Sequence, residues 1–584
     1  MTSVVKGGAL MLALGLAALG CKGAVGGAGP ANVSTGGAGA TGTSGSGAGV
    51  AGGTAGAVGN VTGAAGATTT PPQATCAAGQ QGKPAYQMLR RLSESEFNNT
   101  LIDAFGADGK SWQNIQFVGD LRQSGSFSTL SSALGVNQAW MAGLIDSTFD
   151  RAQSLLAGTP SILVAPCTAT VMDATCATAM VKTYGYRLFR RPVTDAEVTD
   201  YVGLYNQAVG TLKMSPSDAL AGTVAALMQS PNALYIRELG TAAAGGTFKL
   251  SGYELASILS YGLTGTAPSK ALLDSAGTGA LDTATGVASA VQAMVASPQG
   301  QQHMKDFFLQ WLAYDGAPYA AKDPMTYTFG NDVANAMVTE TKTLVETAYQ
   351  KGNSIADLLT SPTTYVNTTL AKFYGWPTTG LTDTTFTPQQ RPAGQGIGLL
   401  AQGGLLARLG TPNSSSPTQR GLFVLRQLIC KDVPAPPANV PVINPPTGNV
   451  TTRQRYETQH AVGSCGACHT HMDDIGFGLE NFDGIGVYRT KENGMPIDAS
   501  GYIADLNHLT FTGPEDLAKK LAAAPEVGQC LAAQMTAYVL GVSVNDGLCI
   551  APAASYAQGG TPLAMSDVLT KIVEPTHLQT RVAP

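Results

Sequence analysis

The chain of 584 residues has few charged side chains: 34 are basic and 39 are acidic, and together they make up 12% of the residues. The net charge of -5 argues against a nucleic-acid-binding protein, which normally carries a basic surface. No apolar run reaches the roughly 18 residues that a membrane-spanning helix needs. The sequence also lacks a glycine-rich phosphate loop, a Gly-x-Ser-x-Gly elbow and a His-Glu-x-x-His metal motif. Nucleotide-binding, hydrolase and integral membrane functions therefore have no support.

Residues 1–21 have the pattern of a bacterial lipoprotein signal. Lys6 precedes an apolar run over 7–20, and the cysteine that would carry the lipid is Cys21. We expect the mature protein to be exported and held to membrane lipid through Cys21; the alternative is a soluble secretory signal with a chance cysteine. Because Lys22 replaces the aspartate that often retains lipoproteins at the inner membrane, we expect an outer-membrane lipoprotein of the cell envelope, facing the periplasm or the surface.

Residues 22–75 are expected to be a disordered tether. No charged residue occurs from 23 to 82, and the first part of this stretch consists almost wholly of Gly, Ala, Ser, Thr and Val. Such a composition cannot bury enough apolar surface to fold. A flexible coil of this length would hold the folded part on the order of 40 Å from the membrane.

Beyond the tether, helix signals dominate the sequence. Three capping boxes precede apolar residues at three- and four-residue spacing: Ser93 with Glu96, Thr194 with Glu197, and Ser251 with Glu254. Alternating, strand-like stretches are few and short. The pattern predicts a mainly α fold with a multi-helical body.

Cys465-Gly-Ala-Cys468-His469 is the attachment signature of one c-type haem. Two thiols one helical turn apart can reach the two vinyl groups of the porphyrin, and the adjacent imidazole can then bind the iron. Three alternatives compete: a thioredoxin-like motif, which would need a βαβ setting; a zinc site, for which only His460 and His471 are near; and a further disulfide. Haem c is attached in the compartment to which the chain is expected to be exported, so export favours haem c. We therefore expect a small cytochrome-c-like haem domain after the multi-helical body.

The sequence does not identify the second axial ligand of the iron. Met495, in Asn493-Gly-Met-Pro496, is a candidate because such a loop can present a distal methionine. Met535 is expected to be a core residue of a helix, and Met472 is too close to His469 in sequence to reach the other face. His460 is a second candidate ligand, with a polar or capping role as the alternative.

The nine cysteines leave six once Cys21 and the two haem cysteines are set aside. An even number in an oxidising compartment suggests three disulfides, although six cysteines allow fifteen pairings. We expect the pairs Cys167–Cys176, Cys530–Cys549 and, by elimination, Cys76–Cys430.

The chain resembles the cytochrome-c-like, five-module bacterial proteins of unknown function found in planctomycete-type and myxobacterial genomes. The motifs that carry the resemblance are Leu89–Thr100, Phe189–Thr194, Leu250–Ala256, Phe308–Leu312, Ser416–Gly421, the haem motif, and the segments Gly476–Gly486 and Pro496–Gly501. The resemblance implies an exported, haem-bearing protein with His469 as proximal ligand, and it also includes His460. Where the family usually has Asp-Pro after the haem histidine, this chain has Asp473-Asp474.

We expect seven segments: the signal 1–21, the tether 22–75, N-terminal helical modules 76–212, a central helical body 213–430, a Pro-rich linker 431–450, a haem c-binding region 451–510 and a C-terminal helical module 511–584. The glycines and aromatics after the haem motif suggest a tight wrap around the porphyrin. Three functions fit: a monohaem electron carrier serving an extracytoplasmic redox partner, a peroxidase- or oxygenase-like haem enzyme, and a non-enzymatic surface protein that binds polysaccharide.

Overall fold

The structure is a computed structural model. It describes residues 89–106, 127–158, 161–314, 321–431, 433, 449–460, 463–545, 557–558, 561–573 and 578–582, all of which belong to the unit Pro71–Pro584. The predictions made for Cys21, the tether, Cys76, Cys549 and most of the linker lie outside the described residues.

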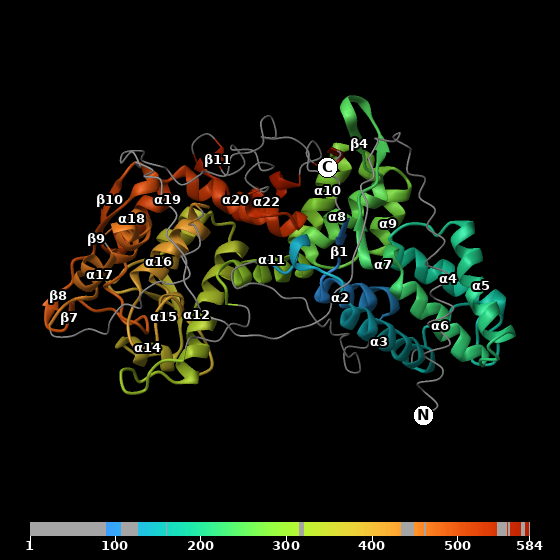
Figure 1. The fold of residues 1–584 in the computed structure, drawn as a ribbon, viewed down its shortest axis with the longest axis horizontal. Helices are drawn as coiled ribbons and strands as arrows, with labels where there is room; N and C mark the ends of the chain where they lie inside the picture. Colours follow the sequence, from blue (N-terminus) through green and yellow to red (C-terminus); the bar gives the residue numbers. More distant parts are fainter. Residues whose placement is uncertain are drawn as a thin grey trace, which may run out of the picture. The chain divides into compact units, whose positions relative to one another are not determined.

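Helices hold 60% of the structure and strands 10%, which confirms a mainly α fold (Figure 1). The helices before the linker are α2 Glu94–Phe105, α3 Gln138–Ala157, α4 Ala174–Phe189, α5 Asp195–Gly210, α6 Pro216–Gln229, α7 Pro231–Leu234, α8 Gly252–Thr264, α9 Lys270–Gly277, α10 Ala284–Ala296, α11 Pro298–Trp311, α12 Asn331–Gln350, α13 Ile355–Thr360, α14 Thr368–Tyr374, α15 Gly403–Arg408, α16 Pro417–Phe423 and the π-helix η6 Val424–Leu428. The helices after it are α17 Thr452–His460, α18 Gly463–Phe477, α19 Gly513–Ala523, α20 Pro525–Leu540 and α22 Met565–Ile572. Single 3-10 turns lie at η2 Ser131–Ala133, η3 Ala244–Gly246, η4 Ala280–Asp282, η5 Leu399–Ala401 and η7 Ala504–Leu506.

The strands are short and pair in antiparallel sheets of two or three strands. They are β1 Leu89–Arg91, β2 Tyr235–Arg237, β3 Thr241–Ala242, β4 Thr247–Lys249, β5 Thr363–Val366, β6 Thr387–Gln390, β7 Lys491–Glu492, β8 Met495–Pro496, β9 Ser500–Ile503, β10 Leu509–Thr512, β11 Ala557–Gln558, β12 Thr561–Pro562 and β13 Thr580–Val582. Two pairs join distant parts of the chain: Leu89 is opposite Arg237, and Thr580 is opposite Lys249. Among the described residues, these sheets contain no parallel pair of the kind found in a βαβ unit.

The three predicted capping boxes are present at the starts of α2, α5 and α8. In each box the N-cap hydroxyl accepts from the backbone of the glutamate, and the glutamate carboxylate accepts from the backbone of the cap residue. At α2 these partners are Ser93 and Glu96. Local hydrogen bonds of this kind depend only on neighbouring residues, which is why the sequence predicts them well.

Large aromatic side chains fill the core between the helices. Trp140 and Trp311 are each 1% exposed, and Phe307 stacks on Trp311 with ring centroids 6.1 Å apart. Arg190 ends α4 in a left-handed conformation and donates to the carbonyl oxygens of Leu188, Ala233, Asn232 and Tyr235. Its guanidinium thus closes a helix end and joins it to α7.

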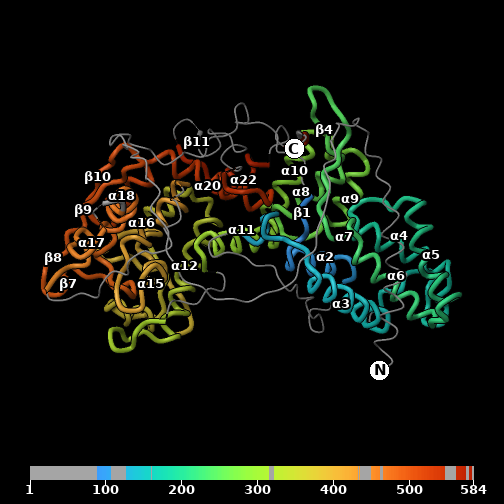
Figure 2. Tube along the Cα trace, viewed as in Figure 1, coloured from blue at the N-terminus to red at the C-terminus, as the bar shows by residue number. Residues whose placement is uncertain are grey.

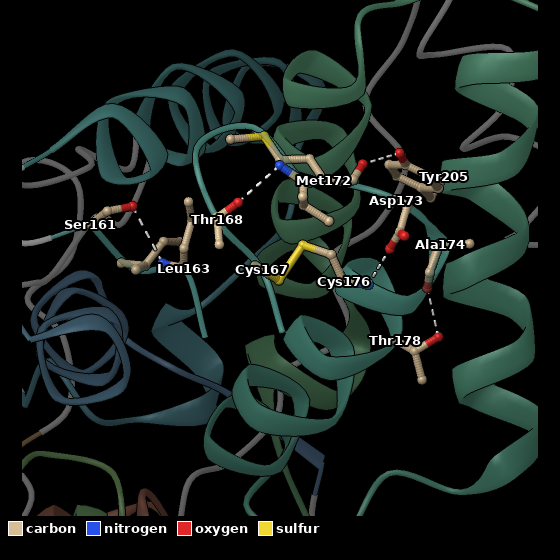
Figure 3. Close-up of a disulfide and its surroundings, with 12 residues drawn as sticks. Ser161, Leu163, Cys167, Thr168, Met172, Asp173, Ala174, Cys176, Thr178 and Tyr205 are labelled. Carbon is tan, nitrogen blue, oxygen red and sulfur yellow. Dashed lines mark hydrogen bonds between the residues drawn. A yellow bond between two sulfur atoms is a disulfide. The ribbon is translucent and has the colours of Figure 1, made fainter. Parts of the chain in front are cut away.

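Two disulfides are present among the described residues. Cys167–Cys176 confirms the predicted pair; it closes the loop that enters α4, where Asp173 accepts from the backbone N–H of Cys176 at 2.9 Å (Figure 3). Cys530 instead pairs with Cys430, so the predicted pairs Cys530–Cys549 and Cys76–Cys430 are wrong. The reason is tertiary: α20 packs against η6 and brings Cys530 beside Cys430, 100 residues earlier.

Helices α16 and α18, on either side of the Pro-rich linker, pack against each other, and both views label them in the same region (Figures 1 and 2). Glycine permits the close approach. A Cβ at Gly421 would lie 1.8 Å from the carbonyl oxygen of Met472, and one at Gly476 would lie 2.0 Å from that of Pro417. Any other residue at these positions would force the two helices apart.

In the part of the chain that the structure describes, every helix is too short or too polar to cross a lipid bilayer.

Candidate functional site

Helix α18 carries the complete Cys-x-x-Cys-His motif. Cys465, Cys468 and His469 occupy positions i, i+3 and i+4, so their side chains lie on one face of the helix. Both cysteines are free and exposed, whereas the other four described cysteines are in disulfides. The two thiols are therefore available for covalent attachment beside an imidazole.

A buried carboxylate holds that imidazole. Oδ2 of Asp473 lies 3.2 Å from Nδ1 of His469 and 2.6 Å from Nδ1 of His460, while its Oδ1 accepts from Thr418 at 2.5 Å. Burial raises the pKa of Asp473, but the hydrogen bonds from His460, His469 and Thr418 outweigh it, so this pKa lies below its usual value. An ionised carboxylate only accepts, so each Nδ1 is the donor in these contacts and each Nε2 is the ring nitrogen left for another partner.

The two imidazoles lie side by side. The ring centroids of His460 and His469 are 3.7 Å apart, and Tyr456 packs edge-on against His460 at 4.9 Å. Because both Nδ1 atoms face Asp473, both Nε2 atoms face away from it. His460 therefore lies directly beside His469, and its ligation of iron stays a prediction.

His471 belongs to a separate pair. Its Nδ1 lies 2.8 Å from Oδ2 of Asp505, in η7, whose carboxylate is only 2% exposed. His460 and His471, the pair considered for a zinc site, therefore contact different carboxylates. The group of possible metal ligands that the described residues do contain is His460, His469 and Asp473, with ligand atoms within 4.8 Å of one another.

The glycine-rich segment after α18 surrounds an arginine. The guanidinium of Arg420, from α16, donates to the backbone carbonyls of Leu479, Phe482 and Asp483 and to the carboxylate of Glu480 at 3.0 Å. Arg420 and Glu480 are 0% and 2% exposed. The segment predicted to wrap the porphyrin thus folds around Arg420. These hydrogen bonds and the ion pair with Glu480 fix the C-terminal end of α18 to α16.

The candidate distal ligand Met495 lies on the β7–β8 hairpin with 40% of its surface exposed, and its ligation of iron stays a prediction. Met472 and Met535 are buried at 6% and 0% exposure, as expected for core residues.

Sequence reasoning missed the role of Asp473. It follows His469 by four residues, so a helix places both side chains on one face, and this spacing could have indicated the contact. The contact with His460 depends on how α17 packs against α18, which no local pattern shows.

The fold and the site therefore define a multi-helical protein with an exposed Cys-x-x-Cys-His helix. Three segments match models of protein families of unknown function: 176–238 match PSD5 (DUF1595), 250–376 match PSD4 (DUF1592) and 397–492 match PSCyt3 (DUF1588). These are modules of planctomycete-type, cytochrome-c-like multi-module proteins, in agreement with the resemblance seen in the sequence. The PSCyt3 match runs through the Pro-rich linker and includes both α16 and α18. Searches of the curated proteins and of the solved structures found no match.

The residues of α18 fit a c-type haem by the chemistry of their donor set. Two free thiols can form the thioether bonds, and Nε2 of His469 is free to bind the iron because Asp473 engages the other ring nitrogen.

Proposed function

We propose that the protein is an exported, membrane-anchored c-type cytochrome with one haem, attached through Cys465 and Cys468 and bound axially by His469. The observation that supports this most directly is the geometry of α18: both free thiols and the imidazole share one helical face, and a buried carboxylate orients the imidazole. Two of the alternatives weighed for this motif lack such support, because the described sheets offer no βαβ setting for a thioredoxin-like motif and both thiols are free rather than joined in a disulfide.

Haem c would supply one-electron chemistry, and we propose electron transfer with an extracytoplasmic redox partner. The chain's own residues have defined tasks. Cys465 and Cys468 anchor the group at an exposed helix face, where a partner protein can approach it. Asp473 holds the Nδ1 proton of His469 and keeps the ring oriented. Arg420 and Glu480 fix the helix that carries the two attachment cysteines and the axial histidine.

The proposal includes the location. Cys21 would carry the lipid, and the protein would belong to the outer membrane of the cell envelope. The presence of two disulfides supports an oxidising compartment, which is also where haem c is attached.

A second candidate is a site for a divalent metal ion at His460, His469 and Asp473. The observation that favours it is the convergence of two imidazoles and one carboxylate, a ligand set that suits zinc or non-haem iron. This candidate needs no cysteine, so Cys465→Ala with Cys468→Ala would leave the metal content unchanged, whereas the same double variant would abolish covalent haem.

The absorption spectrum of the exported protein, oxidised and reduced, tests the proposal. We expect the bands of a c-type haem with a six-coordinate iron in the parent protein. If Met495 is the distal ligand, Met495→Ala changes the coordination and His460→Ala does not. A five-coordinate spectrum that changes on addition of peroxide or cyanide would favour the haem enzyme. A colourless protein containing zinc would contradict the haem proposal and favour the second candidate.

A further inference from the structure

A cavity of about 530 Å³ opens between α2, the end of α8, α11 and α20. This volume lies within the range of small-molecule sites. Its rim is exposed and polar, with Ser95, Asn99, Gln299 and Gln302. Its floor is buried and includes Thr129, His303 and Tyr538. The cavity therefore has a mouth that solvent can reach and a floor that solvent does not.

Two polar atoms among the buried lining residues have no hydrogen-bond partner: Nε2 of His303 and Oγ1 of Thr129. These residues are only 7% and 3% exposed. Buried polar groups in folded proteins are nearly always hydrogen-bonded, because an unmade bond costs free energy. The other described cavities contain no such atom in their linings. The unpartnered pair thus distinguishes this cavity from the other described cavities.

The imidazole is held in place. The Tyr538 hydroxyl oxygen lies 3.2 Å from Nδ1 of His303, and the ring centroids are 4.7 Å apart. Gly265 approaches from another side with a φ of 65°, in the left-handed range, and a Cβ there would lie 2.6 Å from Nδ1. Contacts of this kind keep the ring in one orientation, so a ligand would meet a preformed site.

The charges around the cavity select against anions. Its charged lining residues are all carboxylates, namely Glu96, Asp103 and Asp306. Each already has a partner: Glu96 accepts from Arg90 at 2.8 Å, Asp103 from Arg187, and Asp306 from Gln302 at 2.9 Å. Arginine side chains therefore balance the charge of two of these carboxylates, Glu96 and Asp103. The remaining polar lining consists mainly of hydroxyl and amide groups, which suit a neutral ligand with several hydroxyls.

We propose that this cavity binds a neutral, polyhydroxylated ligand of about monosaccharide size, whose hydroxyl groups pair with Thr129 Oγ1 and His303 Nε2. The proposal goes beyond the haem function and is independent of it, because no residue of α18 lines the cavity. Either can fail while the other holds.

The test adds D-glucose, D-galactose or N-acetyl-D-glucosamine to the exported protein. Calorimetry and the NMR signals of the His303 imidazole then measure binding. At least one sugar should bind and shift these signals. Thr129→Val keeps the shape of the side chain and removes the unpartnered hydroxyl, so it should weaken binding about tenfold while leaving thermal stability unchanged or higher. If Thr129 served only the fold, Thr129→Val would instead lower the thermal stability.

A matched pair of variants on α11 tests the mouth. Gln299 lines the cavity, whereas Gln301 is exposed and does not line it. Gln299→Trp should abolish binding, and Gln301→Trp should leave it intact. The proposal is overturned if none of the sugars binds, if butylamine binds in preference to them, if Thr129→Val leaves the affinity unchanged, or if a crystal soaked in sugar shows only ordered water beside Thr129 and His303.

Discussion

His460 and His469 lie with their ring centroids 3.7 Å apart, and both direct Nδ1 toward the same oxygen of Asp473. One buried carboxylate therefore sets the orientation of two imidazoles from different helices, α17 and α18. A carboxylate that accepts from a ligating imidazole increases the electron density on its other nitrogen. In the proposed cytochrome, Asp473 would thus help to set the reduction potential through His469.

Asp473→Asn should raise the reduction potential of the haem. The variant removes a buried negative charge and replaces a charge-assisted hydrogen bond with a neutral one, which destabilises the ferric state. If the ferric state loses about 1.4 kcal/mol of stability relative to the ferrous state, the potential rises by roughly 60 mV, because this is a one-electron couple. Potentiometric titration of the exported protein measures the shift.

Asp474→Asn is the matched control, because Asp474 is the next residue and makes no hydrogen bond to either imidazole among those in the structure. Its potential should stay closer to that of the parent. Equal shifts in the two variants would show that Asp473 affects the potential only through its negative charge and not through its hydrogen bond to His469.

Glu480→Gln should lower the free energy of unfolding by about 3 to 5 kcal/mol, because it leaves the buried charge of Arg420 without its counter-charge. Urea denaturation measures the loss. Asp274→Asn breaks the exposed pair with Lys270 and should have little effect. A loss of stability no larger than that of the control would show that the carbonyl groups around Arg420 are enough to stabilise its buried charge.

Removing the Cys430–Cys530 disulfide should destabilise the protein more than removing Cys167–Cys176. The bridges span 100 and 9 residues, so the loop-entropy model predicts a difference of about 2 kcal/mol. Denaturation of Cys430→Ser with Cys530→Ser, beside the other double variant, measures this difference. Peptide mapping of the unreduced protein checks the pairing, and a Cys530–Cys549 peptide would contradict it.

The helical class and the helix starts could be predicted because their causes are local. Ser93 and Glu96 are three residues apart, and their reciprocal hydrogen bonds need no partner from elsewhere in the chain. The partner of Cys530 could not be predicted, because it depends on the packing of α20 against η6. The folding of the glycine-rich segment around Arg420 depends in the same way on the packing of α16 against α18.

For the candidate site, the sequence provided Cys465, Cys468 and His469 as one helical motif, and the structure places them on one exposed helix. It did not provide the link from Asp473 to His460, which requires α17 to lie against α18. It also did not indicate the cavity at His303, because the residues that line it come from five separated segments.

Lowering the pH should reduce stability through His303. Burial lowers the pKa of His303 to about 4, with Glu96 opposing this shift and Arg90 adding to it. In the unfolded chain the imidazole has a pKa of 6.5, so between pH 6.5 and 4 the unfolded state binds a proton that the folded state does not. Stability is therefore fully present above pH 6.5 and falls by about 3 kcal/mol on the way to pH 4.

NMR titration of the His303 imidazole, assigned with His303→Gln, checks this value directly. The signal should stay that of a neutral ring down to about pH 5. A midpoint near 6.5 would show that the ring is hydrated in solution and contradict its burial.

The central claim is that a haem is bound covalently through Cys465 and Cys468. The most direct measurement is haem staining of the denatured polypeptide after expression in a host that matures c-type cytochromes, with Cys465→Ala and Cys468→Ala together as control. The account predicts that haem stays with the parent chain through denaturation and is lost from the double variant. A parent chain that is exported and folded but carries no haem would contradict it.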